Sequence, residues 1–87
     1  MNSIEFYPNP LYDRGVLQIT TKETGQFKVL LINNLGQTVL KQNIEYTDPN
    51  EIKNLEFDMS RYASGVYNLI VVYPSSQKQI KKILKIN

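Results

Sequence analysis

The chain has 87 residues and a formal net charge of +2, with 41% hydrophobic and 21% charged residues. This composition indicates one globular domain with its own core, and argues against a disordered tail or a membrane protein. Because histidine, cysteine and tryptophan are absent, the chain cannot form disulfides, imidazole or thiolate metal sites, or nucleophilic relays that depend on histidine or cysteine. We therefore expect a non-catalytic protein without a metal or cofactor.

Hydrophobic and polar residues alternate along most of the chain, which is the pattern of antiparallel strands. A first strand carries Ile4 and Phe6 on one face and ends at Pro8, because proline lacks the N–H that a sheet uses. Further strands are predicted at residues 16–21, 26–33, 37–46, 52–59 and 66–73. The strands at 26–33 and 66–73 are apolar on both faces, so we expect them at the centres of sheets.

Turn residues separate these strands. Residues 33–36 read Asn-Asn-Leu-Gly, a tight turn, and we expect Gly36 and Gly65 to adopt the positive φ that only glycine tolerates without steric cost. A valine in place of Gly15 is expected to be tolerated. Ser60 is expected to cap a single helical turn at residues 61–63.

The last segment, residues 78–87, holds four lysines and no acid, whereas residues 1–77 hold six basic and eight acidic groups. Its apolar residues fit a helix as well as a strand, but β-branched isoleucines and the short preceding turn favour a strand. Lys81 and Lys85 would then point opposite to Lys82. Lysines in this pattern are typical of a solvated strand face, so replacing these three by glutamine should hardly change the melting temperature.

These elements predict an all-β fold in a single domain, residues 1–87. We expect a compact antiparallel β-sandwich of six or seven strands, immunoglobulin-like. The predicted core residues are Phe27, Val29, Leu31, Leu55, Phe57, Tyr67, Leu69 and Val71. No aromatic residue interleaves with the C-terminal lysines, and no apolar run approaches the roughly 20 residues that span a bilayer, so neither nucleic-acid binding nor membrane insertion is expected.

Aromatic side chains suggest an alternative function. Six tyrosines and three phenylalanines could form a carbohydrate-stacking platform on a small β-sandwich. Most of them are expected in the core or at its rim, and Tyr12 and Tyr46 are the freer candidates. The alternative is a carbohydrate-binding or adhesive module of an extracellular polysaccharide hydrolase.

A series of motifs runs from one end of the chain to the other. They are Tyr7-Pro8-Asn9-Pro10, residues 29–36 followed by Gln37-Thr38-Val39, residues 57–60, residues 63–67 and the closing Lys81-Lys82-Ile83-Leu84-Lys85. In this order they resemble the C-terminal sorting domain of type IX secretion cargo, the Por secretion tail (type A sorting domain), over almost the whole chain. Asn33 departs from the family, which often has Asp before the turn glycine.

The resemblance implies a non-catalytic sorting module at the end of an exported precursor, with an upstream cargo domain that can be an enzyme such as a glycoside hydrolase. It implies recognition by an outer-membrane secretion translocon and removal by a sortase-like peptidase, which can join the cargo to lipopolysaccharide. The implied location is secreted or cell surface, reached through the periplasm of a Gram-negative bacterium. The candidate sorting residues are Tyr7, Pro8, Asn9, Pro10, Gly36, Gly65, Tyr67, Lys81, Lys82 and Lys85.

Two further expectations follow from this resemblance. Only six residues precede Tyr7, so the linker in which cleavage would fall is largely missing, and we expect Met1 to be an engineered start on a fragment of the precursor. A short edge strand near the C-terminus would present free backbone groups and lysines to a receptor. The lysines would set the encounter rate, and the sheet would set the register.

Overall fold

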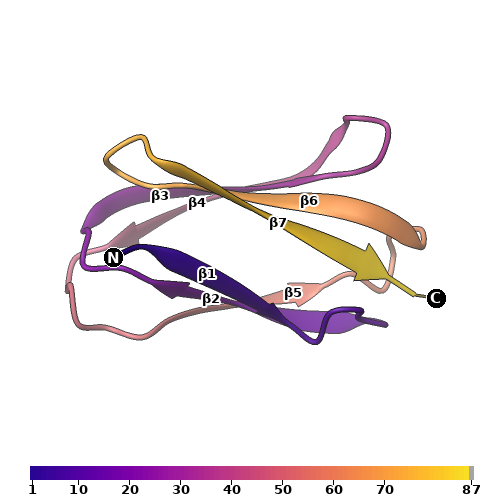
Figure 1. The fold of residues 1–87 in the computed structure, drawn as a ribbon, viewed down its shortest axis with the longest axis horizontal. Coiled ribbons are helices and arrows are strands. Elements are labelled where there is room, and N and C mark those ends of the chain that lie inside the picture. The colour runs from indigo at the N-terminus through magenta and orange to yellow at the C-terminus, as the bar shows by residue number, and fades with distance from the viewer. Residues whose placement is uncertain (87) are drawn as a thin grey trace.

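The computed structural model describes residues 1–86, which form two antiparallel β-sheets packed face to face (Figure 1). The strands are β1 (Ser3–Tyr7), β2 (Arg14–Thr20), β3 (Gly25–Ile32), β4 (Thr38–Tyr46), β5 (Lys53–Asp58), β6 (Gly65–Val72) and β7 (Lys78–Lys85). One sheet has the order β1-β2-β5 and the other the order β4-β3-β6-β7. The predicted immunoglobulin-like sandwich is confirmed, with seven strands. Within residues 1–86 no helix is long and apolar enough to cross a membrane.

The core lies between the two sheets, where alternate residues of each strand point inward. Seven of the eight predicted core residues are buried there. The eighth, Leu55, is half-buried, because β5 is an edge strand with no neighbour on one side. Leu11 and Met59 are completely buried although both lie outside the strands. Leu11 follows no strand periodicity, so the sequence pattern did not reveal it, whereas alternation along the predicted strand at residues 52–59 points Met59 inward, as observed.

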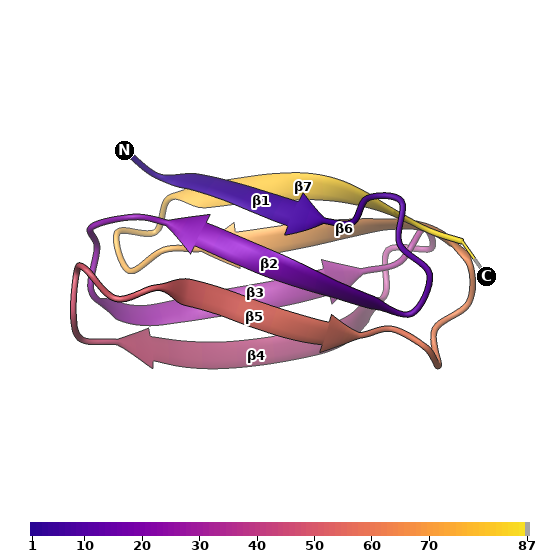
Figure 2. The ribbon, with the colours of Figure 1, turned by 90° about the horizontal axis from the view of Figure 1, so that it is seen from below.

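The four-stranded sheet has the predicted centre. β3 and β6 are its inner strands, and β7 pairs with β6 along its whole length, from Lys78 opposite Val72 to Lys85 opposite Gly65. The last segment is therefore a strand at the sheet edge, as predicted, but with eight residues it is not short. β1 belongs to the other sheet yet runs beside β7 (Figure 2), so β1 closes this side of the sandwich.

The glycines are partly as predicted. Gly36 and Gly65 have φ angles of 80° and 144°, which confirms the expected left-handed backbone. The expectation for Gly15 is wrong, because a Cβ at this position would lie 2.5 Å from Cε1 of Phe6. The Phe6 ring is buried in the core, and a close-packed core does not let it move aside.

The helical turn predicted at residues 61–63 does not form. Tyr62 N–H donates to the Met59 carbonyl at 3.0 Å and closes a β-turn instead. Ser60 is not a cap, since its own N–H donates to Oδ1 of Asp58 at 3.0 Å. β5 ends at Asp58 and β6 begins at Gly65 in the opposite sheet.

Candidate functional site

The first and last motifs of the chain meet at one end of the sandwich. The side chain of Asn9 donates through Nδ2 to the Lys82 carbonyl at 2.9 Å, and its Oδ1 accepts from Leu84 N–H at 3.1 Å. The amide of Asn9 thus imitates a strand backbone and pairs with the outer edge of β7. Residues more than 70 positions apart in sequence form a single site.

Leu11 extends this pairing. Its N–H donates to the Leu84 carbonyl at 3.0 Å, and its carbonyl accepts from Ile86 N–H at 2.8 Å. The side chain of Leu11 is completely buried, which anchors the segment to the core. Residues 9–11 therefore cover the C-terminal half of the β7 edge, and the expected row of free backbone groups is wrong for this half. We refer to Asn9, Leu11 and the part of β7 that they bind as the Asn9 clasp.

The three candidate lysines divide between the two faces of β7, as strand alternation predicts. Lys82 is exposed on the outward face, whereas Lys81 is half-buried and Lys85 is only 3% exposed. The expectation that these lysines are solvated is wrong for Lys85 and only partly right for Lys81, because the inward face of β7 packs toward β1 and the core. The aliphatic stem of Lys85 therefore packs against its neighbours, as long lysine side chains do on apolar surfaces.

The other predicted site residues frame the same end of the molecule. Tyr7 is half exposed at the end of β1, and Pro8 and Pro10 are exposed after cis peptide bonds. Gly65 opens β6 opposite Lys85. The β3–β4 loop, which contains Gly36, lies at this end too, together with the β1–β2 loop and the end of β7 (Figure 1).

Tyr67 has a structural position. Its side chain is buried, and its hydroxyl donates to the Ala63 carbonyl at 2.5 Å. Burial raises the pKa of Tyr67, with a smaller contribution from Tyr62. The phenol therefore stays protonated and holds the β5–β6 connection against the sheet.

The opposite end of the sandwich holds a polar network that the sequence pattern did not reveal. Asn2 Nδ2 donates to Glu23 Oε2 at 2.7 Å, and Ser75 donates to both oxygens of Glu23 through N–H and Oγ at 3.0 and 2.9 Å. These hydrogen bonds, led by that from Asn2, lower the pKa of Glu23. Tyr73 lies nearby, and burial, followed by the charge of Glu23, raises its pKa to about 12. The network fastens the N-terminus to the β6–β7 turn.

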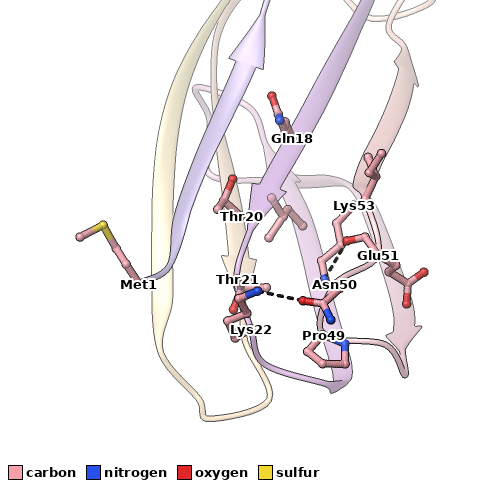
Figure 3. Close-up of a pocket in the computed structure, with 11 residues that line it drawn as sticks. Met1, Gln18, Thr20, Thr21, Lys22, Pro49, Asn50, Glu51 and Lys53 are labelled. Carbon is pink, nitrogen blue, oxygen red and sulfur yellow. Dashed lines mark hydrogen bonds between the residues drawn. The ribbon is translucent and has the colours of Figure 1, made fainter.

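A cleft of about 310 Å³ lies beside the 49–53 segment at this second end (Figure 3). Lys53 reaches it from β5 although only 2% of this residue is exposed. Its Nζ donates to the Glu51 carbonyl at 3.1 Å and lies 5.4 Å from the centroid of the Tyr46 ring. Lys22 Nζ donates to Oδ1 of Asn50 at 2.9 Å. Protein acceptors thus already engage both ammonium groups.

The two freer candidates for the alternative carbohydrate platform, Tyr12 and Tyr46, do not share an exposed surface. Tyr12 is 65% exposed, but Tyr46 is buried against Phe27, with ring centroids 5.3 Å apart in an edge-to-face arrangement. The expectation that Tyr46 is free is wrong, because this residue ends β4 on an inward position. Of these two candidates only Tyr12 is exposed, so they do not form a stacking surface together.

Comparisons with known proteins agree with the arrangement of the motifs. A family model described as the secretion system C-terminal sorting domain matches residues 5–86. Comparison with curated proteins finds no match. Among solved structures, the chain is similar to dimeric latent PorU from Porphyromonas gingivalis, with a TM-score of 0.76 and 17% identity over 99% of this chain. The chain spans only 9% of that PorU chain, so this likeness concerns the fold.

Proposed function

The chain belongs to the family of secretion system C-terminal sorting domains, which target the proteins that carry them for type IX secretion, and we propose that an outer-membrane translocon binds its folded sandwich. The observation that carries this proposal is the family match over nearly the whole chain. In the proposed precursor, residues 1–87 are a single C-terminal domain behind a cargo domain. Recognition of this kind needs a shaped surface and no reacting group, so the domain itself catalyses no reaction.

The Asn9 clasp supports a role for the first and last motifs as one recognition unit. Asn9, Pro10 and Lys82 lie together only when the sandwich is folded, because Asn9 reaches Lys82 through a hydrogen bond across the sheet edge. A receptor that binds this end of the molecule would therefore distinguish folded domains from unfolded ones. Tyr7, Pro8 and Lys82 supply exposed side chains there.

A reporter fusion tests this role. A fluorescent reporter placed ahead of the chain is expressed in a Gram-negative bacterium with a type IX system, and its surface and periplasmic fractions are measured. Asn9→Ala removes both side-chain hydrogen bonds and should shift the reporter toward the periplasm. Asn54→Ala, on an exposed position of β5, is the matched control and should behave like the parent. Equal surface fractions for both variants, with Asn9→Ala still folded, would contradict the proposed role of the clasp.

We further propose that a sortase-like peptidase removes the domain after export, so that the cargo is released or anchored to lipopolysaccharide. The mass of the surface reporter measures this step. The expected product lacks the sandwich and is absent when the peptidase gene is deleted. A surface reporter that retains all of residues 1–86 would overturn the cleavage step and leave the export step standing.

A further inference from the structure

The outward side of the four-stranded sheet is unusually apolar. Its outward apolar side chains are Leu30, Ile32, Val66, Ile70, Val72, Ile80 and Leu84. Ile80 is 63% exposed, and Val66 and Leu84 are exposed to 39% and 41%. Leu30, Ile70 and Ile80 are direct neighbours on β3, β6 and β7. They form a continuous apolar row across three strands.

Four lysines surround this row. Lys41 faces Leu30 from β4, Lys28 and Lys78 flank Val72, and Lys82 lies opposite Asn68. Within residues 1–86, the only carboxylate that points outward from this sheet is Glu45, which lies at the far end of β4 and accepts from Gln26 at 3.3 Å. We refer to the apolar residues and these four lysines as the basic apolar face.

The sandwich does not require an apolar exterior to fold. An antiparallel sheet packs its core with one face and usually presents polar residues on the other. The three-stranded sheet follows this rule, since its outward positions include Glu5, Gln18, Asn54, Glu56 and Asp58. A contiguous apolar patch bordered by polar groups is the usual mark of an interaction site.

We propose that the basic apolar face is the docking surface for a protein partner that presents an apolar patch bordered by carboxylates. The inference rests on the proposed recognition by the export machinery and adds a second contact surface to the Asn9 clasp, the outer side of the four-stranded sheet. Lysines that meet an acidic rim accelerate encounter and reject wrong partners, while the apolar row supplies affinity through buried area. A second copy of this chain does not fit, because its four lysines would face the same four lysines.

The face is less suited to a lipid surface. It carries no aromatic side chain, the residue type that anchors proteins at membrane interfaces. Leu30 and Ile70 are half-buried, so a flat bilayer would meet the lysines and Ile80 first. A protein partner with protruding side chains can contact the recessed residues of the row, Leu30 and Ile70.

Charge reversal tests the docking surface in the reporter fusion. Lys28→Glu with Lys78→Glu places two carboxylates beside the row, and its surface export should fall about tenfold through repulsion of an acidic partner. The matched control is Glu5→Lys with Glu56→Lys, two exposed reversals on the other sheet, and should export like the parent. Melting curves of the purified fusions verify that both variants remain folded.

The outcomes separate this inference from the sorting function. If the parental fusion fails to reach the surface, the sorting role itself fails. If the parent and the Lys28→Glu, Lys78→Glu fusion are exported equally well, the docking surface is wrong and the sorting function still stands. Ile80→Ser provides a second variant without added charge and should also reduce export. Flotation of the parental fusion with phosphatidylglycerol vesicles, lost in the charge-reversed fusion, would replace the protein partner by a membrane and overturn the proposal.

Discussion

The two outer surfaces of this sandwich differ in chemistry although both cover the same core. The outward positions of β1, β2 and β5 are mostly polar, with three carboxylates, whereas those of β3, β6 and β7 combine an apolar row with lysines. Because the polar surface suffices for one sheet, the apolar surface of the other is not a requirement of folding. The difference separates residues that hold the sandwich together from residues that are available to a partner.

The largest expected effect contrasts two adjacent residues of β6. Leu69 points inward and is completely buried, while Ile70 points outward and is half-buried. Leu69→Ala should lower the free energy of unfolding by about 2–5 kcal/mol through lost transfer energy and a cavity. Ile70→Ala should lower it clearly less. Urea unfolding of both variants measures this, and equal losses would mean that the outer row is part of the core after all.

A second effect concerns the inward face of the three-stranded sheet. Gly15→Val should destabilise the domain by about 1–3 kcal/mol or more, because the new side chain overlaps the Phe6 ring. The matched variant Val16→Ala changes the neighbouring outward position and should cost less. The measurement is the melting temperature of both variants. A Gly15→Val protein with parental stability would show that the Phe6 ring can move aside without cost to the core.

A smaller effect contrasts two lysines of β7. Lys85→Gln removes a stem that packs inward and should cost about 1 kcal/mol, whereas Lys82→Gln changes an exposed side chain and should stay within about 0.5 kcal/mol. Chemical unfolding at neutral pH distinguishes them. A larger loss of stability for Lys82→Gln than for Lys85→Gln would mean that Lys82, and not Lys85, points inward.

The smallest effect is the response to acid. Hydrogen bonds from Asn2 and Ser75 lower the pKa of Glu23 below its ordinary 4.5, and Ser60 lowers that of Asp58 below 3.8. A lowered pKa means that the folded state favours the carboxylate. The added stability is therefore present above the ordinary pKa and is lost as the pH falls through the lowered value. Melting temperatures measured from pH 6 down to about pH 2 should fall less steeply for Glu23→Gln with Asp58→Asn than for the parent. If the melting temperatures of the variant and the parent fall equally steeply with pH, these two carboxylates do not contribute to the stability of the folded state.

Sequence alternation predicted most of the fold, because a strand that buries one face must alternate. It placed β3 and β6 at the centre of their sheet, and it predicted that Lys82 points opposite to Lys81 and Lys85. It did not predict that Lys85 is buried, because that depends on how β1 and Leu11 close the sandwich beside β7. Local periodicity likewise says nothing about which distant segments meet.

The candidate site likewise depends on contacts between distant segments, which local periodicity does not predict. The motif residues were found from their order in the chain, but the hydrogen bonds from Asn9 to β7 come from tertiary structure alone. Tyr46 was misplaced as a free aromatic because one residue at the end of a strand can turn either way. The network around Glu23 uses Asn2 and Ser75, polar residues in segments that carry no repeating pattern.

Site-specific photocrosslinking during export shows whether a protein partner binds the basic apolar face. A photoreactive phenylalanine derivative is placed at Ile80, in the basic apolar face, or at Gln18, an exposed position on the outer face of β2, and the reporter fusion is irradiated in exporting cells. We expect a protein adduct from position 80 and little or none from position 18. Adducts from position 18 alone, with both fusions exported, would mean that the partner binds the three-stranded sheet and not the basic apolar face.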